Sequence, residues 1–285
     1  MNTPFYVFMK LLPKNAASRI FGAFTRLRIP FLSKIARNAF ASYYKLDMSE
    51  SEYPLSHYKN IGELFIRKLK PGMRPVADGA EIVSPVDGVL SQTGTFDGDD
   101  QNLIQAKGKT YTLKSLLRSE ELAERFKGGA FATIYLAPFN YHRIHSPVKG
   151  DLVLSSYCPG TLWPVNVGSV ERVEGLFCIN ERLTSHIRLD DGSEMLVVKV
   201  GATNVGRIGV AYTDELLVNA GKLPRNCKRY DWKPAQKITV EKGGELGRFE
   251  MGSTVILVVD KKIRERNPGL FQSRVGTAVK VGEAL

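Results

Sequence analysis

Ser253 stands directly after a glycine, at the start of a strongly apolar run. The segment reads Gly252-Ser253-Thr254 and continues as Val-Ile-Leu-Val-Val. Glycine leaves the carbonyl before Ser253 unobstructed and permits unusual backbone geometry. The serine hydroxyl could attack that carbonyl and turn the peptide into an ester. Elimination would release the upstream chain, and hydrolysis of the resulting dehydroalanine would leave ammonia and an N-terminal pyruvoyl group. The same pattern is also common at an ordinary turn into a strand.

A base for this reaction could come from Tyr-His-Arg-Ile-His-Ser-Pro, which holds His142 and His145, two of the four histidines. Histidine titrates near neutral pH and suits proton transfer. A three-residue spacing could also form a metal pair on a helix, but Pro138 and Pro147 bracket the segment and disfavour a helix. No cysteine lies near enough to complete a zinc signature. Structural and catalytic histidines both stay open at this point.

Two further segments contain residue types that indicate a turn or a close approach of the backbone. Asp87 lies in Ser-Pro-Val-Asp-Gly between two strand-like runs. An Asp-Gly pair there is usually a turn. The run from Val200 to Gly206 contains two glycines, which indicates a bulge or a close backbone approach.

The elements that must position these residues are mostly short strands. From about residue 80, β-rich runs alternate with Gly, Pro and Asn turns, and strand–helix alternation is lacking. We therefore predict an α+β fold with a mostly antiparallel, β-sandwich-like core and one main helical stretch, residues 113–126. The predicted strands are 81–84, 88–93, 130–136, 150–156, 181–189, 194–200, 207–211, 238–240, 253–259 and 275–281.

The N-terminal segment differs from this body in charge. Residues 1–46 contain eight Lys or Arg and no Asp or Glu, whereas the rest of the chain holds 32 bases and 29 acids. Apolar residues recur at helical spacing in residues 15–29 and again in 32–43. This pattern is typical of basic amphipathic helices that lie on an anionic membrane surface. Core-packed helices and a partner-binding helix are the alternatives. Residues 47–78 read as a connector with a short helix near 61–69.

Composition bounds the other possibilities. The chain has 285 residues, of which 43% are hydrophobic and 24% charged, so it can form a sizeable core. Its three cysteines form no CxxC pair and suggest a reducing compartment. No apolar run approaches the ~18 residues that span a bilayer. A nearly neutral body disfavours a nucleic-acid binder.

Taken together, these segments resemble the phosphatidylserine decarboxylase family of the short bacterial type. The matches run in family order along nearly the whole chain, which makes them specific. They are Phe65-Ile66-Arg67-Lys68-Leu69, Pro85-Val86-Asp87-Gly88, Gln105-Ala106-Lys107-Gly108, Tyr141-His142-Arg143-Ile144-His145, Pro159-Gly160-Thr161-Leu162, Asn180-Glu181-Arg182, Val200-Gly201-Ala202-Thr203 and Gly252-Ser253-Thr254. Met251 replaces the leucine of the usual cleavage motif and has a similar size.

The resemblance implies a self-cleavage triad of Asp87, His145 and Ser253. Cleavage between Gly252 and Ser253 would give a large subunit, residues 1–252, and a small one, residues 253–285. The catalytic core would then be residues 79–285. An aspartate that orients a histidine, which in turn deprotonates a serine, is a sound physical arrangement for this step.

The resemblance also implies the second reaction and its setting. Phosphatidylserine would form a Schiff base with the pyruvoyl group derived from Ser253, lose carbon dioxide and give phosphatidylethanolamine. His142 is the candidate proton donor, with His145 as the alternative. No metal is expected. The processed protomers would form a homodimer, bound peripherally to the cytoplasmic face of a bacterial inner membrane.

Three other hypotheses remain. One is a membrane-docked β-sandwich module without activity. Another is a carrier domain, suggested by the turn at Asp87, although such domains need an exposed lysine at a hairpin tip. The third is a pyruvoyl decarboxylase for a different serine-headgroup lipid.

Overall fold

A computed structural model describes residues 2–96, 101–203, 207–213, 216, 226–231, 238–250, 253–271 and 275–285, with the backbone alone at Ser253. Gly252 and residues 204–206 of the glycine-containing run lie outside the described residues.

A nine-stranded sheet forms the centre of the molecule, and all its strand pairs are antiparallel. Its strands follow the spatial order β10 (Lys228–Asp231), β6 (Gly150–Cys158), β7 (Arg182–Arg188), β8 (Glu194–Val200), β13 (Ser253–Val259), β4 (Ala130–Leu136), β1 (Gly88–Thr95) and β14 (Ala278–Val279), and β11 (Thr239–Val240) also pairs with β6.

Both faces of this sheet are buried. Alternate side chains of β13 divide between two cores, with Val255 and Leu257 in one and Ile256 and Val258 in the other. This follows from the two-residue period of a strand. A second sheet of three strands packs on the first face through residues such as Phe249. Its order is β5 (Arg143–His145), β12 (Glu245–Glu250) and β9 (Arg207–Val210).

Helices and a hairpin cover the opposite face. They are the hairpin β2 (Asn102–Ala106) and β3 (Lys109–Thr112), and the short helices α5 (Leu113–Leu117), α6 (Glu120–Glu124), α7 (Val167–Arg172) and α8 (Leu176–Ile179). Helix α9 (Lys261–Arg266) follows β13 and is capped by Asp260, which accepts a hydrogen bond from the Ile263 N–H at 2.9 Å.

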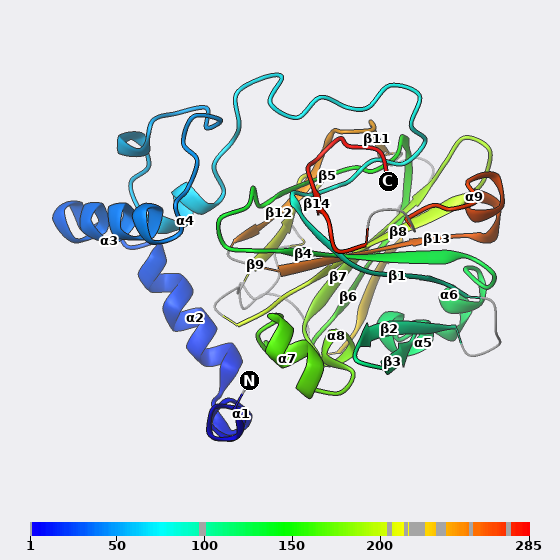
Figure 1. The fold of residues 1–285 in the computed structure, drawn as a ribbon, viewed down its shortest axis with the longest axis horizontal. Helices are drawn as coiled ribbons and strands as arrows, with labels where there is room; N and C mark the ends of the chain where they lie inside the picture. The colour runs from blue at the N-terminus through cyan, green and yellow to red at the C-terminus, as the bar shows by residue number, and fades with distance from the viewer. Residues whose placement is uncertain are drawn as a thin grey trace.

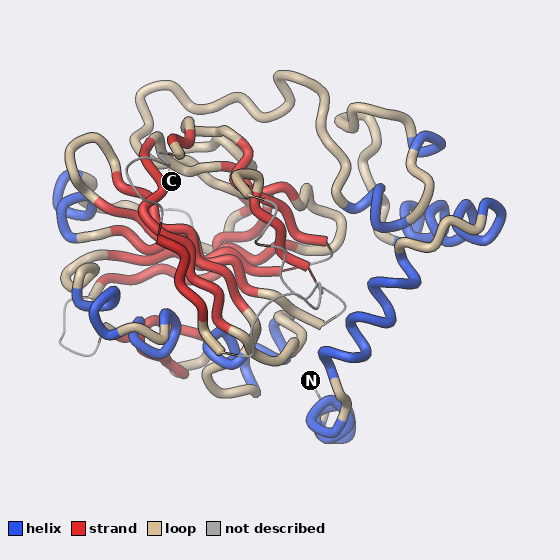
Figure 2. The backbone as a smooth tube through the Cα atoms, turned by 180° about the vertical axis from the view of Figure 1, so that it is seen from behind, coloured by secondary structure: helices blue, strands red, loops and turns tan. Residues whose placement is uncertain are grey.

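Three helices at the N-terminus project from one end of the sheet body, drawn in blue in Figure 1 and seen from behind in Figure 2. They are α1 (Thr3–Leu11), α2 (Lys14–Thr25) and α3 (Pro30–Tyr43). The 3₁₀ turn η1 (Leu55–His57) and helix α4 (Ile61–Phe65) come next, and the chain then arches over the sheet to reach β1 (Figure 1).

The α+β class and the predominance of antiparallel pairing are confirmed. The predicted strands 130–136, 194–200 and 253–259 match β4, β8 and β13 residue for residue. All three are buried on both faces, and their continuous β-branched and apolar runs give the strongest strand signal in the chain.

Several element predictions were wrong in detail. The stretch 113–126 is two helices, because Arg118 adopts a left-handed conformation with φ 49° and Ser119 starts the next helix as its cap. Residues 81–84 form only an isolated bridge between Val83 and Ala284. Helix α4 ends at Phe65, and β14 is two residues long. Helix α1, the hairpin β2–β3 and strand β12 were not predicted.

Candidate active site

The C-terminal end of β4 brings the distant motifs together. Leu136, the last residue of β4, pairs with Ser253 at the start of β13. On the other side of β4, Tyr135 pairs with Val89, so Gly88 lies beside the same strand end. Because the pairs are antiparallel, β1 and β13 both begin where β4 finishes. Asp87, Ser253 and the histidine loop after β4 therefore lie at the same end of the sheet, where β4 finishes.

Gly88 is required for this approach. A Cβ atom added to Gly88 would lie 2.5 Å from the Tyr135 carbonyl oxygen, which is closer than a carbon atom can be tolerated. A glycine is the residue that lets β1 run this close to β4. The turn-like Asp-Gly pair is therefore a strand start fixed by packing.

Two backbone hydrogen bonds hold the histidine segment over this edge. The His145 N–H donates to the Pro85 carbonyl at 2.8 Å, and the Phe249 N–H donates to the His142 carbonyl at 3.0 Å. His145 belongs to β5, which confirms that the segment between Pro138 and Pro147 is not helical.

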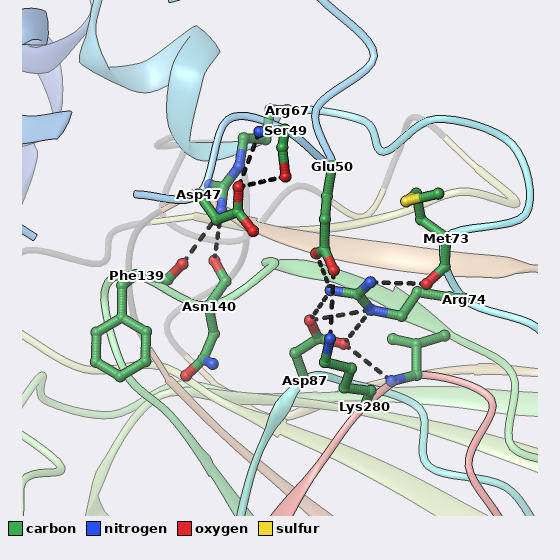
Figure 3. Close-up of polar contacts among 11 residues, drawn as sticks. Asp47, Ser49, Glu50, Arg67, Met73, Arg74, Asp87, Phe139, Asn140 and Lys280 are labelled. Carbon is green, nitrogen blue, oxygen red and sulfur yellow. Dashed lines mark hydrogen bonds and ion pairs between the residues drawn. The ribbon is translucent and has the colours of Figure 1, made fainter. Parts of the chain in front are cut away.

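Asp87 is buried and its carboxylate is held by Arg74. The Arg74 Nη2 lies 2.6 Å from Asp87 Oδ2, and its Nε lies 2.9 Å from Oδ1. The Val281 N–H also donates to Oδ1 at 2.9 Å. Glu50 accepts from the same Arg74 Nη2 at 2.6 Å, so the guanidinium lies between two carboxylates, as Figure 3 shows. Burial opposes the charge of Arg74, but the bonds to Asp87 and Glu50 outweigh burial and raise its pKa above the ordinary value.

Arg74 was not predicted as a site residue. It lies between Gly72 and Pro75, near the end of the segment predicted as a connector. A basic residue beside a proline turn gives little local signal. Its pairing with Asp87 depends on how the connector packs against the start of β1, which the local sequence does not indicate.

His145 has both ring nitrogens engaged. Its Nδ1 lies 2.7 Å from the Gly243 carbonyl oxygen and its Nε2 lies 3.1 Å from the Tyr141 hydroxyl. A carbonyl only accepts, so Nδ1 carries the proton and Nε2 keeps a lone pair. Burial lowers the pKa of His145, while the Gly243 bond and the nearby carboxylates of Glu245 and Asp87 oppose that shift. The neutral ring is thus oriented as a base.

His142 lies in a different environment. It is fully buried, and its ring stacks on Phe65 with centroids 4.0 Å apart and planes 10° from parallel. Within the described residues, neither ring nitrogen has a hydrogen-bond partner. Burial lowers the pKa of His142 well below its ordinary value, and the positive charge of Arg67 adds to that shift. A buried imidazole without partners is rare in a folded protein and indicates a functional position.

The backbone segments that contain the three expected triad residues lie together, but no hydrogen bond joins the side chains of Asp87 and His145 among the described residues. Within the described atoms, Asp87 bonds to Arg74 and Val281, and His145 bonds to Gly243 and Tyr141. The orienting bond to the imidazole therefore comes from a carbonyl. The charge of Asp87 opposes the lowering of the His145 pKa by burial.

The comparisons with known proteins decide the family. The family model for phosphatidylserine decarboxylase matches residues 61–285, which is most of the chain. The chain belongs to the phosphatidylserine decarboxylase family. It is accordingly a decarboxylase, an enzyme of the carboxy-lyase class.

Similar proteins extend this match over nearly the full length. A phosphatidylserine decarboxylase proenzyme of Myxococcus xanthus (strain DK1622) is 47% identical over 260 residues, covering 90% of each chain. A proenzyme of the same name from Anaeromyxobacter sp. (strain K) is also 47% identical, over 97% of this chain and 95% of the relative. A third, from Brevibacillus brevis, is 45% identical over 96% of this chain.

The decarboxylase carries its N-terminal helices in an unusual orientation. The residues of α2 that are buried against the body are Lys14, Ser18, Gly22 and Thr25, all small or polar. Ile20 and Phe24, on the opposite side, are exposed. Helix α3 repeats this arrangement, since it buries Ser33, Arg37 and Ala41 and exposes Phe31, Leu32 and Ile35. A helix of a water-soluble protein normally does the reverse.

Polar contacts hold these helices in place. The Arg37 Nη1 donates to the Tyr58 carbonyl at 2.6 Å, and the Asn15 Nδ2 donates to the Gly160 carbonyl at 2.8 Å. Tyr6 of α1 stacks on Trp163 with centroids 5.7 Å apart. The exposed apolar surface is therefore part of an ordered arrangement. None of the described helices combines the length and the apolar character needed to cross a bilayer.

Proposed function

We propose that this chain is a phosphatidylserine decarboxylase proenzyme that cleaves itself between Gly252 and Ser253. The observation that carries the proposal is the meeting of Asp87, the histidine segment and Ser253 at the end of β4. The relatives named as proenzymes support it, because that name implies a precursor. The products would be subunits 1–252 and 253–285, assembled as a homodimer.

In the self-cleavage step, Nε2 of His145 releases the Tyr141 hydroxyl, to which it is bonded in this structure, and takes the proton of the Ser253 hydroxyl. The Gly243 carbonyl keeps the proton of the ring on Nδ1, and the charge of Asp87 stabilises the imidazolium that forms. Arg74 and the Val281 N–H fix the position of the Asp87 carboxylate, which has only 5% of its surface exposed. The order Asp, His, Ser along the chain is immaterial, since the triad is defined in space.

Ser253 is well placed to become the catalytic group. Cleavage before it leaves the new N-terminus on the first residue of β13, whose pairing with β4 and β8 continues to Val259. A pyruvoyl group there supplies a ketone that binds the substrate amine and a conjugated carbonyl that draws electrons from the bond to the carboxyl carbon. His142, buried beside the same strand end, is the proposed proton donor to the α-carbon.

The exposed face of α2 and α3 is proposed to lie in an anionic membrane surface. Ile20, Phe31 and Tyr43 expose at least 72% of their surface, and the segment 1–46 holds eight bases without an acid. Apolar side chains would enter the headgroup region while the bases attract anionic lipid. The proposed location is peripheral, on the cytoplasmic face of the inner membrane, where the substrate is a bilayer lipid.

The proposal is tested with purified wild type and Ser253→Ala. Wild type should show two chains by denaturing gel and intact mass, with no free amine on the small chain. It should release carbon dioxide from phosphatidylserine vesicles and leave phosphatidylethanolamine. Ser253→Ala should remain one chain and release none.

Asp87→Ala provides the second arm and should accumulate as one chain. An active, uncleaved wild type with an intact serine would refute the pyruvoyl mechanism. Two-chain material from Asp87→Ala would remove Asp87 from the triad. Vesicles with another serine-headgroup lipid test the substrate, because faster release from that lipid would reassign it.

A further inference from the structure

Arg67 is a buried cation that forms no ion pair with a carboxylate among the described residues. It follows α4, and only 5% of its surface is exposed. Its Nη2 donates to the carbonyls of Phe139 and Asn140, at 3.1 and 3.5 Å, in the loop between β4 and the histidine segment, as Figure 3 shows. Arg67 thus reaches from the connector into the active-site edge.

The other two nitrogens of this guanidinium are unsatisfied. Within the described residues, Nε and Nη1 have no hydrogen-bond partner although both are buried. Burial accordingly lowers the pKa of Arg67. Leaving a charged donor buried and unpaired costs more than the ~1–3 kcal/mol of a neutral group. Native proteins rarely keep such a group without a use for it.

A second buried polar group without a partner lies close by. His142 has two unpaired ring nitrogens, and its ring stacks on Phe65, two residues before Arg67. Arg67 in turn binds the carbonyl of Asn140, two residues before His142. Two adjacent donors without acceptors indicate that an anion belongs beside them.

Arg67 also lines a pocket of about 320 Å³ that opens to the surface. The other basic residues that line it are His57, Lys68 and Arg143, and the acidic residues that line it are Glu52 and Glu63. Arg143 is already neutralised, because its Nη1 binds both oxygens of Glu245 at 2.7 and 2.8 Å. Arg67 is therefore the buried cation of this pocket that is left to receive a ligand.

We propose that Arg67 binds the phosphodiester of the lipid headgroup and so positions the serine moiety between His142 and Ser253. The inference rests on the proposed function. The carboxylate of the substrate is a poorer ligand for this cation. The carboxyl group departs as neutral carbon dioxide and its negative charge passes with the electron pair of the breaking bond to the α-carbon side, so a fixed positive charge on the carboxylate would stabilise the ground state. The phosphodiester keeps its charge throughout the reaction.

The experiment compares Arg67→Met, Arg67→Lys and the control Lys59→Met in processed enzyme. Lys59 is exposed in the same segment, and its replacement by methionine removes the same charge. With a short-chain, monomeric phosphatidylserine, Arg67→Met should raise KM by roughly 10- to 100-fold with kcat within about threefold, since the lost interaction is uniform binding. Arg67→Lys should recover part of the loss, and Lys59→Met should match wild type.

A second measurement separates the two anions of the headgroup. Inhibition by glycerophosphoethanolamine, which has the phosphodiester but no carboxylate, should weaken in Arg67→Met by the same factor as KM rises. Inhibition by O-methylserine, which has the carboxylate but no phosphate, should not change.

Three results would overturn the inference. They are an unchanged KM in Arg67→Met, a loss confined to kcat, and an equal loss of inhibition by both compounds. A wild type that releases no carbon dioxide from phosphatidylserine would instead refute the proposed function. A variant that matures and melts as wild type does but has a raised KM excludes a purely structural role.

Discussion

At the scale of single residues, the site depends on a carboxylate and a cation that fix each other. Asp87 and Arg74 expose 8% and 9% of their side chains. Removing one member of a buried pair leaves the other without compensation and costs ~3–5 kcal/mol. Loss of Arg74 would affect Asp87, whose charge is proposed to stabilise the His145 imidazolium.

Arg74→Met is therefore expected to slow maturation at least ~10-fold, because the unpaired carboxylate is driven toward its neutral form. Arg74→Lys should recover only part of the rate, since lysine lacks the fork that contacts both carboxylate oxygens. Gel densitometry over time after synthesis measures the fraction of two-chain protein. Lys70→Met, an exposed neighbour, is the control. Maturation of Arg74→Met at the wild-type rate would show that Asp87 does not need this partner.

The two histidines are expected to separate the two reactions. His145 is bonded and oriented as a base, whereas His142 is buried without partners beside Phe65. His145→Gln should remain largely a single chain. His142→Gln should mature but lose ~10²–10⁴-fold in decarboxylation, the range for a general acid. Gels and carbon dioxide release from the same samples measure both. Full activity of mature His142→Gln would assign the proton transfer elsewhere.

At the scale of elements, the N-terminal helices show how a local pattern and a packing arrangement differ. The sequence correctly indicates helices with an apolar and a basic side. It does not say which side faces the protein. Helices α2 and α3 bury small and polar residues and leave their apolar side exposed.

Exchanging two of these exposed residues tests their role. The double variant Ile20→Ser, Phe31→Ser should bind anionic vesicles at least ~100-fold more weakly, because each side chain contributes ~1.5–3 kcal/mol on transfer from water. Both residues are exposed, so stability should stay within ~0.5 kcal/mol. Sedimentation with vesicles measures binding, and a short-chain soluble substrate should be turned over as in wild type. Ile104→Ser, on the exposed side of β2, is the control. Equal sedimentation of both variants would contradict the docking proposal.

At the scale of the whole molecule, one buried lysine ties stability to pH. Lys199 of β8 is fully buried, and its Nζ donates to the Ser185 hydroxyl at 2.6 Å. Burial lowers its pKa from 10.5 to about 7. The lysine has no carboxylate partner among the described residues, so the fold favours its neutral form.

The pH dependence follows from this shift. Between pH 7 and 10.5 the unfolded chain holds a proton on Lys199 that the folded chain releases, so stability rises with pH. The stability that comes from burying neutral Lys199 is fully present above the unfolded pKa of 10.5 and is lost as the pH falls toward about 7. From pH 7.5 to 9.5 the gain would be about 2–3 kcal/mol.

Lys199→Met should remove this slope and raise the melting temperature most at pH 7.5. Thermal unfolding of both proteins in the uncleaved Ser253→Ala background, at several pH values, isolates the effect of the lysine. Parallel curves for the two proteins would mean that Lys199 is not neutralised on folding.

Sequence alone determined much of this protein. Continuous apolar and β-branched runs specify β4, β8 and β13, because strands buried on both faces can contain little else. The linear order of the motifs, including Pro85-Val86-Asp87-Gly88 and Gly252-Ser253-Thr254, identified the family. It also supplied candidate residues, because residue types such as His and Ser carry their chemistry with them.

Tertiary structure decided how those residues are held. Arg74 lies 13 residues before Asp87 and Gly243 lies 98 residues after His145, and neither has a local pattern that indicates its role. The pairing of β4 with β1 and β13 brings the site together, and the connector contributes Arg74 and Arg67 to it. Local sequence sets backbone preference and the periodicity of burial. Which charged groups share a buried space depends on contacts between distant segments, which only the folded chain specifies.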